Sequence, residues 1–156
     1  MGIDNNFPKA FLKSQIASGN NLPRKGNVFI SVKDEDKENV ILMSQMLIKL
    51  GFKLVGTTGT SNFLKKFCID IKTINKVREG QPHILDIIEQ NKINLIINTT
   101  QNSDSLKDSL SIRRSAIKYK IPYVTTISAA KLAISSINTI KKEKLEVKSL
   151  QEYYKL

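Results

Sequence analysis

From residue 27 to residue 137 the sequence alternates short apolar runs with longer amphipathic stretches. The apolar runs are short and rich in Ile, Leu, Val and Phe, as in buried strands, whereas the amphipathic stretches carry apolar residues at helical spacing. Strands that alternate with helices predict a parallel sheet covered by helices on both faces. The sequence therefore predicts an α/β domain with a doubly wound, Rossmann-like and mainly parallel sheet of five strands.

Local signals place the individual elements. Asp34 and Asp36 offer N-caps for a helix that Gly51 closes, and residues 105–108 resemble a capping box. Residues 95–97 are apolar on both faces, which is typical of a central buried strand. The predicted strands are residues 28–32, 52–55, 70–74, 95–97 and 122–125, and the predicted helices are residues 7–18, 34–50, 61–67, 82–90, 105–118 and 128–137.

The segment before this alternation is set apart by its composition. Residues 7–18 have the apolar spacing of a short amphipathic helix, and the stretch 19–26, with two glycines and a proline, reads as a linker. We therefore divide the chain into an N-terminal helix and linker, residues 1–26, and a main domain, residues 27–156. A helix held away by a linker has little to pack on. We expect it to pack loosely or against another copy of the chain.

The chain is strongly basic, with 25 Lys and Arg against 14 Asp and Glu. This charge favours anionic ligands and raises the question of nucleic acid. However, the basic residues are mostly scattered lysines, and there is no tryptophan to stack on a base. No apolar run is long enough for a membrane span, and the N-terminus lacks the apolar core of an export signal. We expect a cytoplasmic protein that binds neither nucleic acid nor membrane.

Most residues that could carry chemistry also have structural interpretations. Cys68, the only cysteine, lies in an apolar stretch, and we expect a buried thiol. His83, the only histidine, follows Pro82 at a predicted helix start, where it is expected at the surface or as a cap. Arg113 and Arg114 lie on a predicted helix and are expected to be exposed, with an interface as the alternative. Without a cluster of His and Cys at ligand spacing, we expect no metal site.

Polar residues follow each predicted strand, at the edge where the carboxyl ends of parallel strands meet. The sharpest element is GTTGTS at residues 56–61. Its glycines let the backbone approach an anion, its threonine hydroxyls can donate, and the next helix offers its N-terminus. The spacing is neither a P-loop nor a dinucleotide fingerprint. A plain strand-to-helix turn with a threonine cap is the alternative, but lysines at neighbouring strand ends favour a phosphate ligand.

We therefore predict a phosphate site built from hydroxyls, an amide and two lysines at this edge. Its residues are Lys37, Thr57, Thr58, Thr60, Lys76, Asn98 and Thr100. Asp34 and Asp36 could be taken for a catalytic carboxylate pair, but helix capping explains both. We predict no catalytic residues.

Five sequence blocks resemble a known family. They are VFISVKDEDK (28–37), LVGTTGT (54–60), NKVREGQPHI (75–84), LIINTT (95–100) and SIRRSA (111–116). In order and spacing they resemble the methylglyoxal-synthase-like domains, above all the version at the C-terminus of carbamoyl-phosphate synthase large subunits. The resemblance runs from about residue 7 to the end. It implies that the chain corresponds to a fragment whose first helix joins the preceding ATP-grasp region.

The resemblance implies a regulatory, effector-binding role. Such domains bind a nucleotide monophosphate, UMP or IMP, at positions that match Lys37, Thr57, Thr60, Lys76, Asn98 and Thr100, and border an ornithine site at positions that match Tyr123 and Thr125. The resemblance implies no cofactor in this domain. It implies a parent subunit that uses ATP with Mg²⁺ or Mn²⁺ to make carbamoyl phosphate for arginine and pyrimidine biosynthesis, from bicarbonate and glutamine-derived ammonia. The implied partners are the rest of that subunit and a glutaminase small subunit.

The chain departs from this family pattern in three places. QNSD at residues 101–104 stands where Ser-Gly-Arg-Arg is usual, Gln81 replaces a common arginine, and Arg78 replaces a common histidine. The identity of the effector is therefore open. The alternative function is a methylglyoxal synthase acting on dihydroxyacetone phosphate, which needs a carboxylate base from a Gly-Gly-Asp stretch. Here Glu79-Gly80-Gln81 lacks that aspartate, so we expect the fragment itself to be non-catalytic.

Overall fold

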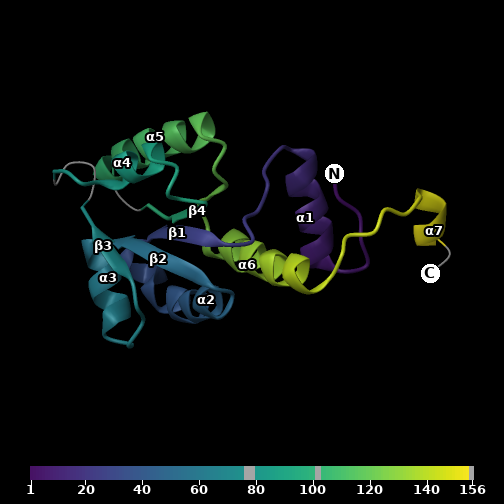
Figure 1. Cartoon of the computed structure of the whole chain (residues 1–156), viewed down its shortest axis with the longest axis horizontal. Helices are drawn as coiled ribbons and strands as arrows, with labels where there is room; N and C mark the ends of the chain where they lie inside the picture. The colour runs from purple at the N-terminus through teal and green to yellow at the C-terminus, as the bar shows by residue number, and fades with distance from the viewer. Residues whose placement is uncertain (76–79, 101–102, 155–156) are drawn as a thin grey trace.

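The computed structural model describes residues 1–75, 80–100 and 103–154, and it contains one sheet of five strands in the order β3-β2-β1-β4-β5 (Figure 1). All neighbouring strands are parallel, which confirms the predicted fold class. The strands are β1 (Gly26–Ser31), β2 (Phe52–Thr57), β3 (Lys72–Ile74), β4 (Leu95–Asn98) and β5 (Tyr123–Val124). The helices are α1 (Phe7–Ala17), α2 (Lys37–Lys49), α3 (Thr58–Lys65), α4 (Ile84–Glu89), α5 (Ser103–Lys118), α6 (Ile127–Lys142) and α7 (Leu150–Tyr154), with a 3₁₀ turn η1 (Asp34–Asp36) before α2.

The strand order reverses at β1. The chain runs outward from β1 to β2 and β3, then returns through α4 to β4 on the other side of β1 and continues to β5. In register, Ile30 of β1 lies beside Gly56 of β2 and Ile97 of β4. In a doubly wound sheet, ligands bind beyond the carboxyl ends of the strands at such a reversal. The fold therefore directs attention to the ends of β1 and β4.

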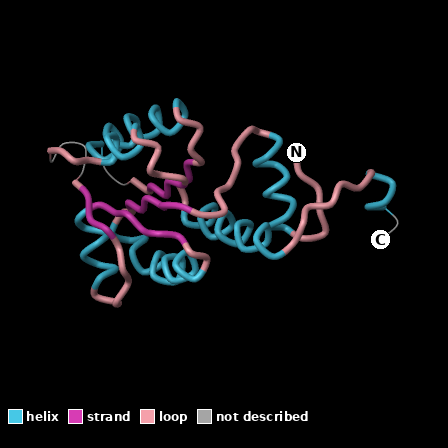
Figure 2. The backbone as a smooth tube through the Cα atoms, viewed as in Figure 1, coloured by secondary structure: helices cyan, strands magenta, loops and turns pink. Residues whose placement is uncertain are grey.

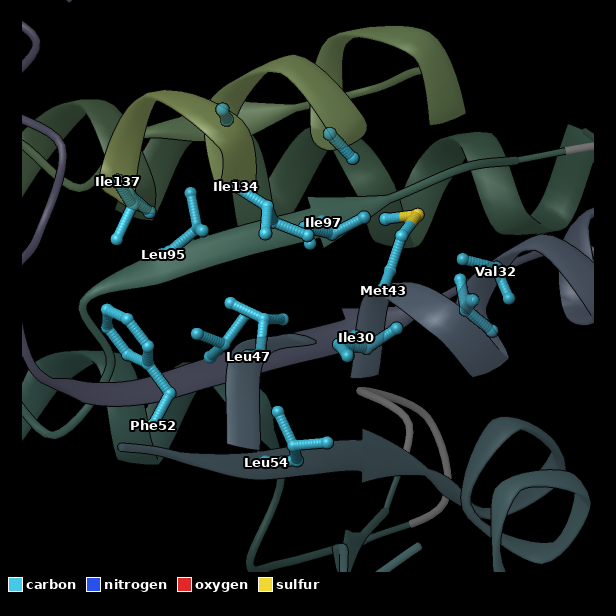
Figure 3. Close-up of a cluster of buried hydrophobic side chains, with 14 of the residues drawn as sticks. Ile30, Val32, Met43, Leu47, Phe52, Leu54, Leu95, Ile97, Ile134 and Ile137 are labelled. Carbon is cyan, nitrogen blue, oxygen red and sulfur yellow. The ribbon is translucent and has the colours of Figure 1, made fainter. Parts of the chain in front are cut away.

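Helices cover both faces of the sheet, which Figure 2 shows as a magenta layer between cyan coils. On one face, side chains of β1, β2 and β4 pack against α2, α3 and α6, as with Met43, Leu47 and Ile134. Figure 3 shows these apolar side chains meeting between the sheet and the helices. On the other face, Phe29 of β1 packs with residues of α4 and α5. Successive residues of β1 thus enter opposite cores, as the period of two requires.

The N-terminal helix belongs to the first of these cores. Leu12 of α1 is fully buried in the cluster that contains Ala133 and Ile137 of α6, and Ser136 donates a hydrogen bond to the Pro8 carbonyl oxygen at 2.9 Å. Figure 1 shows α1 beside α6. The expectation that this helix packs loosely, or only against another copy, is therefore wrong. Sequence spacing could not show that a helix 110 positions later supplies its partner.

The two terminal segments meet at one ammonium group. Lys13 of α1 pairs with Asp4 at 2.7 Å and donates to the Ile3 carbonyl at 3.2 Å and to the Tyr153 hydroxyl at 2.9 Å. Tyr153 belongs to α7, a short helix that the sequence did not predict. The hydrogen bonds to Asp4 and to Tyr153 raise the pKa of Lys13 above its usual value. These contacts hold α7 against the residues that precede α1.

Two local predictions are corrected. Cys68 is exposed, because α3 ends at Lys65 and Cys68 lies in a left-handed turn with φ of 57°. Asp36 occupies the N-cap position of α2, but its side chain makes no capping hydrogen bond. Asp34 instead pairs with Lys37 at 2.6 Å. Among the described residues, no helix is both long and apolar enough to cross a membrane.

We predict that Leu12→Ala lowers the free energy of unfolding by about 2–5 kcal/mol, because it leaves a cavity between α1 and α6. The matched control is Ile16→Ala on the same helix, where the side chain is 44% exposed. We expect it to cost less than about 1 kcal/mol. Urea denaturation of both variants makes the comparison. Equal small losses would show that α1 does not contribute to the core.

Candidate functional site

The candidate site lies where β1 and β4 end, at the reversal of strand order. Beyond the strands, the Thr99 amide donates to the Ser31 carbonyl at 3.0 Å, which extends the ladder by one bond. The Lys33 amide then donates to the Thr99 hydroxyl at 3.1 Å. Thr99 is buried, and its two hydrogen bonds link the loop after β1 to the end of β4. We call the carboxyl ends of β1, β2 and β4, with the first turn of α3, the rim.

The sequence GTTGTS does not form a loop between β2 and α3. The predicted helix at 61–67 begins three residues earlier, so Thr58, Gly59 and Thr60 form the first turn of α3. Gly56 permits this tight entry: a Cβ there would lie 2.8 Å from Ile71 Cδ1 and 3.0 Å from the Ile30 carbonyl oxygen. A larger side chain at this position would have to move the Ile71 side chain and would press on the backbone of β1.

The hydroxyls of Thr57 and Thr60 point into the protein and tie α3 to β1. Thr60 is 1% exposed, and its Oγ1 accepts from the Val32 amide at 3.2 Å. Thr57 Oγ1 lies 3.3 Å from Ser31 Oγ and 3.5 Å from Thr60 Oγ1. Thr57 occupies the N-cap position, yet its side chain makes no capping hydrogen bond. The turn is therefore not the threonine-capped one that the alternative interpretation requires. The first amides of α3 lack intrahelical partners.

Lys37 brings a positive charge to this helix start. Its Nζ lies 3.9 Å from the position that a Cβ would take on Gly59, and 5.9 Å from the centroid of the Phe63 ring. Its pair with Asp34 is exposed on the acidic side, where the carboxyl side chain is 86% exposed. An exposed pair of this kind is weak and is easily exchanged for an anionic ligand. The ammonium and the positive end of the helix dipole thus favour an anion at the same place.

A second lysine at the rim is fixed by its neighbour. Lys33 Nζ donates to Glu35 at 2.5 Å, and this hydrogen bond raises the pKa of Lys33. Its side chain is 28% exposed, so the pair stays in contact with water. Among residues 1–75, 80–100 and 103–154, no three His, Cys, Asp or Glu side chains gather where they could hold a metal ion.

The end of β4 connects to β5 and α5. Asn98 is buried, and its Nδ2 donates to the Tyr123 hydroxyl at 2.8 Å. The same hydroxyl lies 2.9 Å from Ser109 Oγ on α5. Thr100 is half-buried beyond Asn98, and Thr125 is exposed beyond β5.

The structure brings together many of the predicted site residues, but not in equivalent roles. Lys37 and the exposed Thr58 lie at the start of α3, whereas the hydroxyls of Thr57 and Thr60 already join secondary-structure elements. Lys76 lies outside the described residues. The predicted site did not include Ser31, Thr99 and Ser109, although Ser31 lies near the end of one predicted strand and Thr99 two residues after another.

His83 lies at a helix start, as expected, but the capping hydrogen bond there is made by the Asp86 side chain. It is the N-cap residue of α4, and its backbone amide donates to Asp86 Oδ2 at 2.9 Å. Its Nδ1 lies 3.2 Å from the same oxygen.

We predict that Thr60→Val lowers the free energy of unfolding by about 1–3 kcal/mol, because the buried Val32 amide loses its acceptor. The control is Thr58→Val, which makes the same chemical change at an exposed position two residues earlier. It should change stability by less than about 0.5 kcal/mol. Guanidinium denaturation measures both. A neutral Thr60→Val would mean that the Val32–Thr60 hydrogen bond does not hold the rim together.

Comparison with known proteins gives a family. The family model for the MGS-like domain matches residues 39–125. The chain is 45% identical over 153 residues to the carbamoyl phosphate synthase large chain of Myxococcus xanthus (strain DK1622), across 98% of this chain and 14% of that protein. It is 42% identical over 156 residues to the protein named carbamoyl phosphate synthase large chain, C-terminal section, of Methanopyrus kandleri, across 99% of this chain and 29% of that protein. The chain thus spans a small part of the curated relatives it matches.

A solved structure agrees on the fold. The crystal structure of methylglyoxal synthase from Elizabethkingia anophelis NUHP1 superposes with a TM-score of 0.61, over 86% of this chain and 93% of that one. At 15% sequence identity this likeness concerns the fold alone. Together with the family model and the relatives above, it leads to one conclusion. The chain belongs to the MGS-like domain family, in the form found in the C-terminal section of the carbamoyl phosphate synthase large chain.

Proposed function

We propose that this chain is the regulatory domain of a carbamoyl phosphate synthase large chain and binds a phosphate-bearing effector at the rim. The observation that carries the proposal is the Lys37 ammonium at the uncapped start of α3. Relatives named as that large chain match nearly the whole of this chain, which supports the assignment to such a subunit. The activity of the whole subunit, ATP-dependent synthesis of carbamoyl phosphate, is part of the proposal.

The first turn of α3 supplies the expected anion contacts. Amides of the first turn of a helix have no intrahelical acceptors, so they can donate to phosphate oxygens. Thr58 is exposed at the first position of the helix, where its hydroxyl can add a further donor. Lys37 supplies the countercharge, and a charge-assisted hydrogen bond is about twice as strong as a neutral one. These are contacts to a phosphate group and not to a base, so they fit UMP and IMP alike.

Thr57 and Thr60 support the site from beneath. Their hydroxyl oxygens connect α3 to the loop after β1, and so fix the distance between the two elements that would surround a phosphate. In this proposal Thr60 positions the helix start and Lys37 contacts the ligand. Asn98 and Thr100 complete the rim from β4, and Lys76 keeps its predicted role as a second cation. Tyr123 and Thr125 keep their predicted place at an ornithine border.

Regulation would follow from differential binding. An effector shifts a conformational equilibrium only as far as its affinities for the two states differ. The domain would tune distant ATP-dependent steps by binding UMP or IMP more tightly in one state of the subunit.

We predict that Lys37→Met weakens the binding of UMP or IMP by about ten-fold or more, because it removes a charge-assisted contact. Lys76→Ala should have an effect of similar size. The matched control is Lys142→Met, which removes the same charge from an exposed position at the end of α6. It should change affinity by less than about two-fold at physiological salt. Calorimetric titration measures all three variants. If Lys37→Met and Lys142→Met weakened binding equally, the loss would reflect the net charge of the protein, and the proposed contact between Lys37 and the phosphate would be wrong.

We predict that the chain alone catalyses neither ATP hydrolysis nor the release of methylglyoxal from dihydroxyacetone phosphate. A methylglyoxal synthase needs a carboxylate base, and Gln81 stands where that enzyme carries its aspartate. Phosphate and methylglyoxal are assayed after incubation of the pure protein with each substrate. Gln81→Asp is a useful comparison, because it restores the carboxylate. Steady release of methylglyoxal by the unmodified chain would contradict the regulatory assignment.

A further inference from the structure

Three side chains form a hydrogen-bonded chain from the rim to α5. Asn98 at the end of β4 donates from Nδ2 to the Tyr123 hydroxyl at 2.8 Å, and that hydroxyl lies 2.9 Å from Ser109 Oγ. Asn98 and Ser109 are each 5% exposed, so water competes little for these bonds. One phenol oxygen therefore joins two neighbouring strands and a helix.

This arrangement restrains the Asn98 amide. Rotation of the amide about χ2 would break its bond to the Tyr123 hydroxyl and leave buried polar atoms unpaired, which is unfavourable. The tyrosine hydroxyl has a single proton, and when it accepts from Asn98 that proton can be donated to Ser109. The bond uses one amide hydrogen of Asn98, and the second amide hydrogen and Oδ1 turn with it. The orientation of those two groups is set by Tyr123.

Helix α5 holds the same tyrosine in a second way. The guanidinium carbon of Arg113 lies 5.4 Å from the centroid of the Tyr123 ring. Ser109 and Arg113 are four positions apart, so they lie on one face of the helix. The hydroxyl and the ring face of Tyr123 are thereby both in contact with α5. A displacement of α5 must move or release the tyrosine.

We propose that Tyr123 is a positioning residue for the rim: its hydroxyl fixes the Asn98 amide and, through Ser109, couples that amide to the placement of α5. The inference rests on the proposed anion-binding function. A ligand that engages Asn98 then stabilises the Asn98–Tyr123–Ser109 chain and holds α5 in its observed place. Because α5 covers one face of the sheet and α2 and α3 cover the other, occupancy of the rim would affect both layers.

The first test needs no ligand. Nuclear magnetic resonance of the ¹⁵N-labelled chain follows the side-chain amide protons of Asn98, assigned by their disappearance in Asn98→Ala. We expect Tyr123→Phe, which keeps the ring and removes the hydroxyl, to shift these signals and to accelerate their exchange with water. Tyr119→Phe removes a hydroxyl that takes no part in the Asn98–Tyr123–Ser109 hydrogen bonds, so it should leave the Asn98 signals unchanged. Unaltered Asn98 signals in Tyr123→Phe overturn the proposal.

The second test is a double-mutant cycle with UMP or IMP as the titrant. Tyr123→Phe should weaken binding about three- to ten-fold, the range of one neutral hydrogen bond. In an Asn98→Ala background the same substitution should have no further effect, because Tyr123 acts through Asn98. Effects that multiply overturn the positioning role. If the unmodified chain binds neither nucleotide, the proposed function fails, and the Asn98 signals still decide whether Tyr123 orients the amide.

Discussion

β1 lies between β2 and β4 and is hydrogen-bonded to both, so the position of every other strand is set relative to it. Its residues 28–30 are completely buried, with Phe29 in one core and its two neighbours in the other. A strand used on both edges and both faces has no freedom to slide, since a shift by one residue would exchange its two faces. The end of β1 is therefore a fixed point, and the rim is built around it.

Beyond this fixed point the backbone can no longer pair with neighbouring strands, and side chains take over. The Val32 amide donates a hydrogen bond to the hydroxyl of Thr60 in α3. The Lys33 amide donates to the hydroxyl of Thr99, in the segment after β4. Backbone amides at a buried strand end need such acceptors. Because the two acceptors lie on opposite sides of β1, the loop is held between them. Hydroxyls that a sequence suggests as ligand contacts can thus instead hold together the elements that surround the site.

Much of the fold was predictable because its signals are local. In the part of the chain that the structure describes, apolar runs and helical spacing located the five strands and six of the seven α-helices, and the order of β and α elements indicated a parallel sheet. Contacts between distant segments were not predictable in this way. The sequence of residues 7–18 does not indicate that this helix packs on α6. The hydrogen bond from Asn98 to Tyr123 likewise joins residues of two separate strands. Cys68 was misjudged because its apolar neighbours say nothing of a left-handed turn. The candidate site residues were predicted from their positions at strand ends and from a family resemblance. Only the hydrogen bonds in the structure distinguish side chains that can contact a ligand from those that connect secondary-structure elements.

The packing of α1 on α6 also bears on how the chain is made. Ala17, the last residue of α1, and Ile127, the first of α6, are 110 positions apart. A ribosome that adds about 5–20 residues per second needs on the order of 5–25 s to cross that distance. During this time Leu12 lacks its partner helix α6, and β1 lacks β4 for the 64 positions between Ser31 and Leu95. The contact between α1 and α6 is therefore among the last in the described fold to form during synthesis, and Leu12 stays exposed to water until α6 has been made.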